Sequence, residues 1–139
     1  MHYNVGSITL RKFMPVTVLL LAKDLLTREA ITYMLEARDY VVVSVGTTKD
    51  VYSSFDGIAF DALIVIEALD DPDIAYVAFD AKTYQKRLKV ILVDGTTPTG
   101  TTNYLVDHFI QKPYTLPQLE QAVERQTGGP RGKYGQLSY

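Results

Sequence analysis

The chain has 139 residues, of which 47% are hydrophobic and 22% charged, and its formal net charge is −2. This length fits one globular domain with a sizeable core. Because there is no cysteine and there are only two histidines, His2 and His108, we exclude disulfides, thiolate zinc sites, cysteine nucleophiles and multi-histidine metal sites. The near-neutral charge argues against a nucleic-acid-binding surface that covers the whole protein.

Apolar runs such as Val18–Ala22 are far too short to cross a bilayer. Residues 11–22 faintly resemble a signal peptide, but the charged residues Lys23 and Asp24 follow them and no small-residue cleavage site is present. We therefore expect a cytoplasmic protein that binds neither membranes nor nucleic acid.

The folded domain is expected at residues 15–126, between an N-terminal extension (1–14) and a flexible C-terminal tail (127–139). The tail contains four glycines and one proline and has no periodic apolar pattern. Within the domain, strand-like and helix-like segments alternate.

Val16–Ala22 is a nearly continuous apolar run, which is typical of a strand buried on both faces. Asp24 is placed to cap a helix that continues to about Ala37. The residues expected to form the buried face of this helix are Leu26, Ala30, Tyr33, Met34 and Ala37.

Tyr40–Val45 is β-branched and predicts the second strand. Thr47 and Asp50 have the spacing of a capping box and predict a short helix after it. Ala62–Ile66 predicts a third buried strand. The dipeptide Asp71-Pro72 then indicates a helix start, because aspartate caps well and proline suits the first helical turn. The expected core positions after it are Ile74, Val77, Ala78, Ala81 and Leu88.

Val90–Val93 predicts the fourth strand and His108–Gln111 a short fifth one. The connection 95–107 is rich in threonine and glycine, so the helix expected there is short or missing. Thr115 and Gln118 again have capping-box spacing and begin the last helix, which ends at glycine. The apolar stripe expected on this helix consists of Leu116, Leu119, Ala122 and Val123.

Apolar strands that alternate with amphipathic helices predict an α/β fold, a doubly wound parallel sheet with helices on both faces. The ligand site of such a fold lies beyond the carboxyl ends of its strands. The polar residues expected there are Lys23, Asp24, Glu67, Asp94 and Lys112.

Three segments resemble the receiver domain of bacterial response regulators, the chemotaxis-type flavodoxin-like fold: LLLAKDLLTREAITYML (19–35), FDALIVIEALDDPD (60–73) and HFIQKPYTLPQLEQAV (108–123). The resemblance implies five strands in the order 2-1-3-4-5. Its most specific part is Lys112-Pro113-Tyr114 before a capped helix. It also implies that the Lys112–Pro113 peptide bond is cis.

The residues that receivers use for phosphorylation are replaced. Aligned on Arg28, the family's acidic Mg²⁺-binding pair falls on Ala22 and Lys23. The phosphoacceptor aspartate falls on Ile66 or Glu67. We favour Glu67, because an ionisable group fits the strand end and isoleucine fits the buried strand.

Two further positions depart from the family pattern. Asp94 stands where receivers have a hydroxyl residue, and Phe109, which lacks a hydroxyl, stands at their aromatic switch. A lysine at the metal position and an extra carboxylate near the phosphoryl oxygens both oppose phosphorylation. We expect Lys23 and Lys112 to pair with Glu67 and Asp94, so that the pocket closes without a metal or another cofactor. If that burial is deep, removing one partner costs about 3–5 kcal/mol.

The resulting hypothesis is an atypical receiver that is not an enzyme, is not phosphorylated on aspartate and acts through a protein partner. The alternative is a small-ligand binding module or enzyme that uses the same strand-end pocket. A third hypothesis is a protein-interaction domain that forms a homodimer through the last helix. Tyr104, Leu105 and Tyr114 are either available to a partner or cover the core where a helix is missing.

Structural roles compete with these functional ones. Asp24 and Asp71 are explained by helix capping, and Glu67 by a solvated strand end. The acidic group Asp70, Asp71 and Asp73 lacks the glycine and distal glutamate of an EF-hand. Residues 95–101 have the glycine spacing of a P-loop without its lysine.

Overall fold

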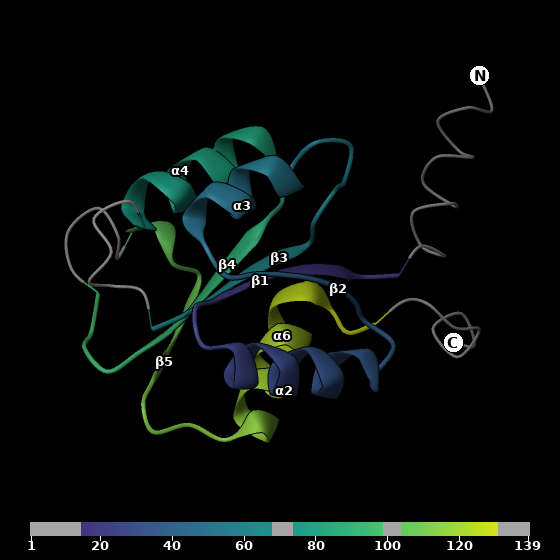
Figure 1. The fold of residues 1–139 in the computed structure, drawn as a ribbon, viewed down its shortest axis with the longest axis vertical. Helices are drawn as coiled ribbons and strands as arrows, with labels where there is room; N and C mark the ends of the chain where they lie inside the picture. Colours follow the sequence, from purple (N-terminus) through teal and green to yellow (C-terminus); the bar gives the residue numbers. More distant parts are fainter. Residues whose placement is uncertain (1–14, 68–73, 99–103, 131–139) are drawn as a thin grey trace.

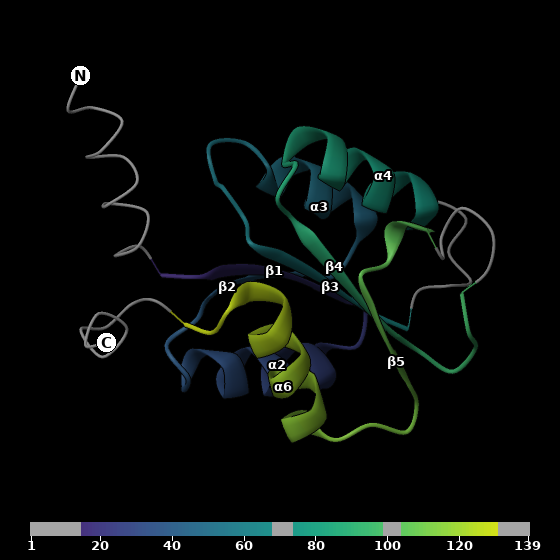
Figure 2. The same cartoon turned by 180° about the vertical axis from the view of Figure 1, so that it is seen from behind.

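The computed structural model describes residues 15–67, 74–98 and 104–130. Five parallel strands form one sheet in the order β2-β1-β3-β4-β5, which confirms the predicted fold class and strand order. The strands are β1 (Thr17–Ala22), β2 (Val41–Val45), β3 (Ala62–Ile66), β4 (Lys89–Asp94) and β5 (His108–Gln111). Helices α2 (Leu25–Glu36) and α6 (Leu116–Thr127) cover one face, and α3 (Thr48–Ser54) and α4 (Ile74–Tyr84) cover the other (Figures 1 and 2).

The central strands are apolar between their ends because helices cover both of their faces. All five residues of β3 are buried. Leu20 pairs in register with Ile64, and Ile64 with Ile91, so a row of large aliphatic side chains crosses the sheet. This row packs against α2 and α6. The alternate residues of the same strands face α3 and α4.

The buried face of α2 differs from the predicted one. Ile31 and Leu35 are buried, whereas Leu26 and Tyr33 are 75% and 78% exposed. Ala30 and Ala37 are exposed as well, and Met34 is half-buried against the core. The prediction failed because α2 carries two apolar stripes at helical spacing, and the helix turns the other one toward the sheet.

Helix α4 buries Val77, Ala78 and Ala81, as predicted. Leu88 is buried too, but it lies beyond the helix, which ends at Tyr84. The predicted helix start at Asp71-Pro72 falls outside the described residues. Helix α3 begins after Thr47, whose hydroxyl accepts the Asp50 N–H at 3.1 Å.

In the described part of the β4–β5 connection, only Tyr104 and Leu105 have helical backbone, and residues 99–103 lie outside the description. Helix α6 runs to Thr127. Gly128 then ends the helix with φ 84°, a left-handed conformation that glycine adopts without strain. No helix among the described residues combines the length and apolarity needed to span a membrane.

The capping box before α6 is complete. The Thr115 hydroxyl accepts the Gln118 N–H at 3.2 Å, and the Gln118 side chain accepts the Thr115 N–H at 2.8 Å. The box satisfies two backbone donors that the first helical turn leaves unpaired.

We expect Thr115→Ala to lower the free energy of unfolding by about 1 kcal/mol, because it removes the capping oxygen. Urea unfolding followed by circular dichroism measures the loss. Thr115→Ser keeps the oxygen and is the matched control. Equal losses in both variants would show that the cap does not stabilise the fold.

Candidate functional site

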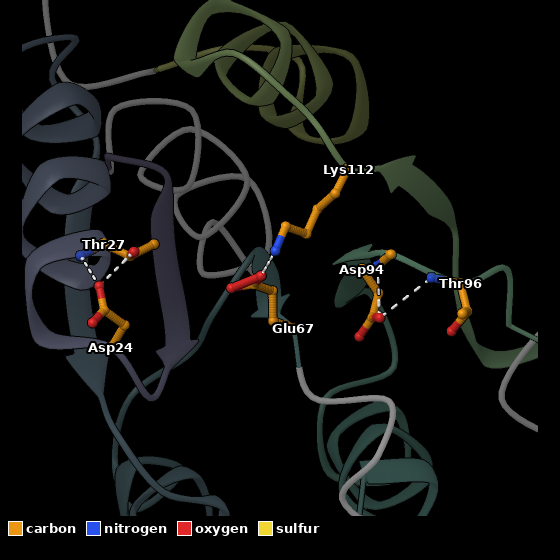
Figure 3. A network of polar contacts seen from close by, with 7 residues as sticks. Asp24, Thr27, Glu67, Asp94, Thr96 and Lys112 are labelled. Carbon is orange, nitrogen blue, oxygen red and sulfur yellow. Dashed lines mark hydrogen bonds and ion pairs between the residues drawn. The ribbon is translucent and has the colours of Figure 1, made fainter.

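The carboxyl ends of the strands bring together polar side chains from four segments (Figure 3). Asp24 follows β1, Glu67 follows β3, Asp94 ends β4 and Lys112 follows β5. Parallel strands place these ends at one edge of the sheet. These four side chains therefore lie at the same edge of the sheet.

An ion pair joins the segment after β3 to the segment after β5, across the end of β4. The Lys112 ammonium donates to Glu67 Oε1, and Figure 3 shows the two side chains pointing toward each other. Their side chains are 44% and 41% exposed. Because this burial is shallow, the pair contributes at most about 1 kcal/mol and not the larger value expected for a deeply buried pair.

The backbone fixes both partners of this ion pair. Glu67 has φ 55°, and its N–H donates to the Val93 carbonyl at 2.6 Å. This left-handed turn directs the chain out of the sheet directly after β3. The Lys112 N–H donates to the Asp94 carbonyl at 2.9 Å, and the Lys112–Pro113 peptide bond is cis, the geometry that the resemblance implies.

The last position of β3 is occupied by Ile66, which is 3% exposed and lies opposite Ala22 and Val93 in the sheet. Glu67 is the next residue and lies outside the strand. An isoleucine cannot accept a phosphoryl group. The carboxylate of Glu67 therefore stands one residue beyond the strand end.

Asp94 folds its carboxylate back onto its own turn. Its Oδ1 accepts the N–H groups of Gly95 and Thr96 at 2.7 and 3.4 Å (Figure 3). Lys23 is exposed at the end of β1. Of the expected lysine–carboxylate pairs, the structure shows Lys112 with Glu67. The expected pairing of Lys23 with one of the two carboxylates stays a prediction.

Asp24 caps α2, as predicted. Its Oδ2 accepts the Thr27 hydroxyl at 2.7 Å and the Thr27 N–H at 2.9 Å. These two hydrogen bonds, the hydroxyl one first, lower the pKa of Asp24 below its usual 3.8, and the Arg28 charge adds to the effect. The carboxylate is thus held in its ionised form at the helix start.

The sequence did not single out Arg28 as a residue of this edge. Its Nη1 donates to the Ala22 carbonyl at 2.7 Å, so the guanidinium covers the end of β1. A Cβ at Gly46 would lie 2.6 Å from this nitrogen. The glycine after β2 therefore leaves the space that the guanidinium fills, and this pairing of distant residues has no local sequence signal.

Phe109 is half-buried and packs with Leu105 against the core on the α3–α4 side of the sheet. Tyr114 packs against the opposite core, and burial raises its pKa. Tyr104 is 87% exposed. The sequence left open whether Tyr104, Leu105 and Tyr114 meet a partner or cover the core. In the structure, Leu105 and Tyr114 cover the core, and Tyr104 is available at the surface.

Within the described ranges, no group of three or more histidine, aspartate or glutamate side chains is arranged to hold a metal ion. The acidic group Asp70, Asp71 and Asp73 lies outside those ranges. At the described strand ends, Lys112 pairs with Glu67, Asp24 caps α2, and Asp94 accepts hydrogen bonds from its own turn.

No protein-family model matches the sequence, and no curated protein matches it. Solved structures do. A response regulator from Thermotoga maritima is 14% identical with a TM-score of 0.72, over 84% of this chain and 100% of that one. A CheY-like receiver domain protein from Methanospirillum hungatei is 18% identical with a TM-score of 0.73, over 83% and 95%. An adenylate cyclase from Rhodopirellula baltica is 14% identical with a TM-score of 0.72, over 83% and 89%. The chain therefore has the receiver-domain fold.

Proposed function

We propose that the chain is an atypical receiver domain that works in signal transduction through contact with a protein partner and is not phosphorylated on aspartate. The observation that carries this proposal is the ion pair between Lys112 and Glu67 at the strand ends. In a phosphorylated receiver, the corresponding lysine would be needed by the phosphoryl group.

The chemistry of the edge supports the absence of phosphorylation. A phosphoryl group on a carboxylate needs a divalent cation and hydrogen-bond donors to balance its charge. Ala22 offers no metal ligand, and Lys23 brings a positive charge to the position of the second one. Asp94 adds negative charge at the position where a donor is needed.

The carboxylates of this edge also support a role other than catalysis. Asp24 caps a helix, Glu67 pairs with a lysine and Asp94 accepts two hydrogen bonds within its own turn. Each carboxylate already has a structural partner, so we propose a binding domain and not an enzyme. The likeness to response-regulator receiver domains supports a protein as the class of partner.

The test is incubation with Mg²⁺ and acetyl phosphate, followed by intact-mass measurement. We expect no added phosphoryl group, because Lys112 is engaged and the metal ligands are missing. A conventional receiver domain in the same mixture shows that the phosphodonor is active. A stoichiometric mass gain in the parent chain would overturn the proposal, and loss of that gain in Glu67→Gln would identify Glu67 as the acceptor.

A further inference from the structure

A hollow lies at the end of the sheet opposite to the candidate site, where strands β3 and β4 begin. Its volume is about 490 Å³. It lies between the segment that joins α3 to β3 and the segment that joins α4 to β4. The lining residues that matter here are Phe55, Ile58, Phe60, Tyr84, Lys86 and Arg87. Figures 1 and 2 show α3 and α4 side by side on this face of the sheet.

Three aromatic rings form the base and wall of this hollow, which we name the α3–α4 groove. The Phe55 ring meets Phe60 edge-on, with centroids 6.2 Å apart, and lies 6.0 Å from the ring of Tyr84. Phe60 is buried, whereas Tyr84 and Ile58 are 70% and 40% exposed. The groove thus presents an apolar surface that stands on a packed base.

Gln85 holds the two walls in place. Its Oε1 accepts the Phe60 N–H at 2.6 Å, and its Nε2 donates to the Ile58 carbonyl at 2.7 Å. One side chain from the end of α4 therefore satisfies both backbone groups of the opposite wall. A groove that is fixed in this way loses little conformational entropy when a ligand binds.

The rim of the groove is basic. Lys86 and Arg87 line it, and Lys89 follows on the same segment. All three are exposed, and within the described part of the chain their side chains have no hydrogen-bond or ion-pair partner. Asp56 lines an adjoining hollow of about 370 Å³. The residues that line the groove include two cations, Lys86 and Arg87, and no carboxylate, which favours an acidic ligand.

We propose that the α3–α4 groove binds an acidic peptide segment of the protein partner, with one apolar anchor side chain. The anchor fills the space between Ile58 and Tyr84, and flanking carboxylates pair with Lys86 and Arg87. The groove is open along its exposed wall, whereas small-molecule sites bury most of their ligand, so a peptide fits better. The proposal rests on the proposed function, since it names the class of partner.

The test starts from a display library of short random peptides selected against the immobilised full chain. We expect enriched peptides to carry an aromatic or long aliphatic residue flanked by aspartate or glutamate. An enriched peptide is then synthesised with a fluorescent label and titrated by anisotropy. The charge reversals Lys86→Glu and Arg87→Glu should together weaken its binding by at least about tenfold.

The matched control is Arg38→Glu, which reverses an exposed charge beside α2 on the other face of the sheet. It should leave the affinity unchanged. Tyr84→Ala should weaken binding, and Tyr84→Phe, which keeps the ring, should restore it. Thermal unfolding of each variant shows that the fold is intact.

Selection of no acidic, apolar peptides would overturn the proposal. So would enriched peptides whose affinity is the same for the parent and for the groove variants. The phosphodonor test reports a covalent change at the strand ends, and the peptide test reports binding at the other edge. The failure of one proposal can therefore be told apart from the failure of the other.

Discussion

Replacing Ile64 by alanine is expected to lower the free energy of unfolding by about 2–5 kcal/mol. Ile64 is fully buried in the middle of β3, where Leu20 and Ile91 flank it in the sheet. Its side chain lies in the core under α2 and α6. The truncation removes the apolar contacts of this side chain and leaves a cavity in the core beside β3, the central strand of the sheet.

Urea unfolding of the parent and the variant at one temperature measures this loss. Val41→Ala is the matched control, because Val41 is 43% exposed on the edge strand β2. We expect the control to cost less than about 1 kcal/mol. If both truncations cost the same, the central strand is not the main source of stability.

The three central strands could be predicted from the sequence because their buried residues are consecutive. Ala62–Ile66 has a polar residue on each side, and its boundaries in the structure are those predicted. The caps at Asp24 and Thr115 could also be predicted, because capping depends on residues three apart. Local chemistry determines both features.

The core face of α2 could not be predicted with equal certainty. Leu26 and Tyr33 form one apolar stripe, and Ile31 and Leu35 form another. Periodicity alone gives both stripes the same weight. In the structure, Ile31 and Leu35 pack in one core cluster with the aliphatic side chains of the sheet. Packing against the sheet therefore determines which stripe is buried.

Residue types at the strand ends could be predicted, but their geometry could not. The sequence placed Glu67 and Lys112 at one edge, yet it gave no sign of the left-handed turn at Glu67. The α3–α4 groove was missed because Phe55 and Phe60 lie in the segment before β3, whereas Tyr84 ends α4, far away in the sequence. Only the topology of the sheet brings these rings together.

Alkaline pH is expected to destabilise the protein through Tyr40, which is 3% exposed beneath α2 and α6. Burial raises the pKa of Tyr40 from 10 to about 12. The neighbouring Thr127 hydroxyl opposes this pKa shift, and the charges of Glu120 and Glu124 reinforce it. The folded state therefore favours the protonated phenol.

The sign of the effect follows from this raised pKa. Below pH 10, Tyr40 is protonated in the folded and unfolded chains alike, and its contribution to stability is complete. As pH rises from 10 toward 12, the unfolded chain ionises first, and about 1–3 kcal/mol of stability is lost. Urea unfolding at pH 9 and at pH 11.5 measures this difference.

Tyr40→Phe should reduce the alkaline loss, because phenylalanine keeps the ring and cannot ionise. A smaller loss should remain, since burial also raises the pKa of Tyr114. Tyr33→Phe is the control, because that ring is 78% exposed on α2. If Tyr33→Phe reduces the loss as much as Tyr40→Phe, ionisation of the buried phenol is not its cause. If only the Tyr40 variant does so, closure of α2 and α6 over the sheet depends on a neutral ring at this position.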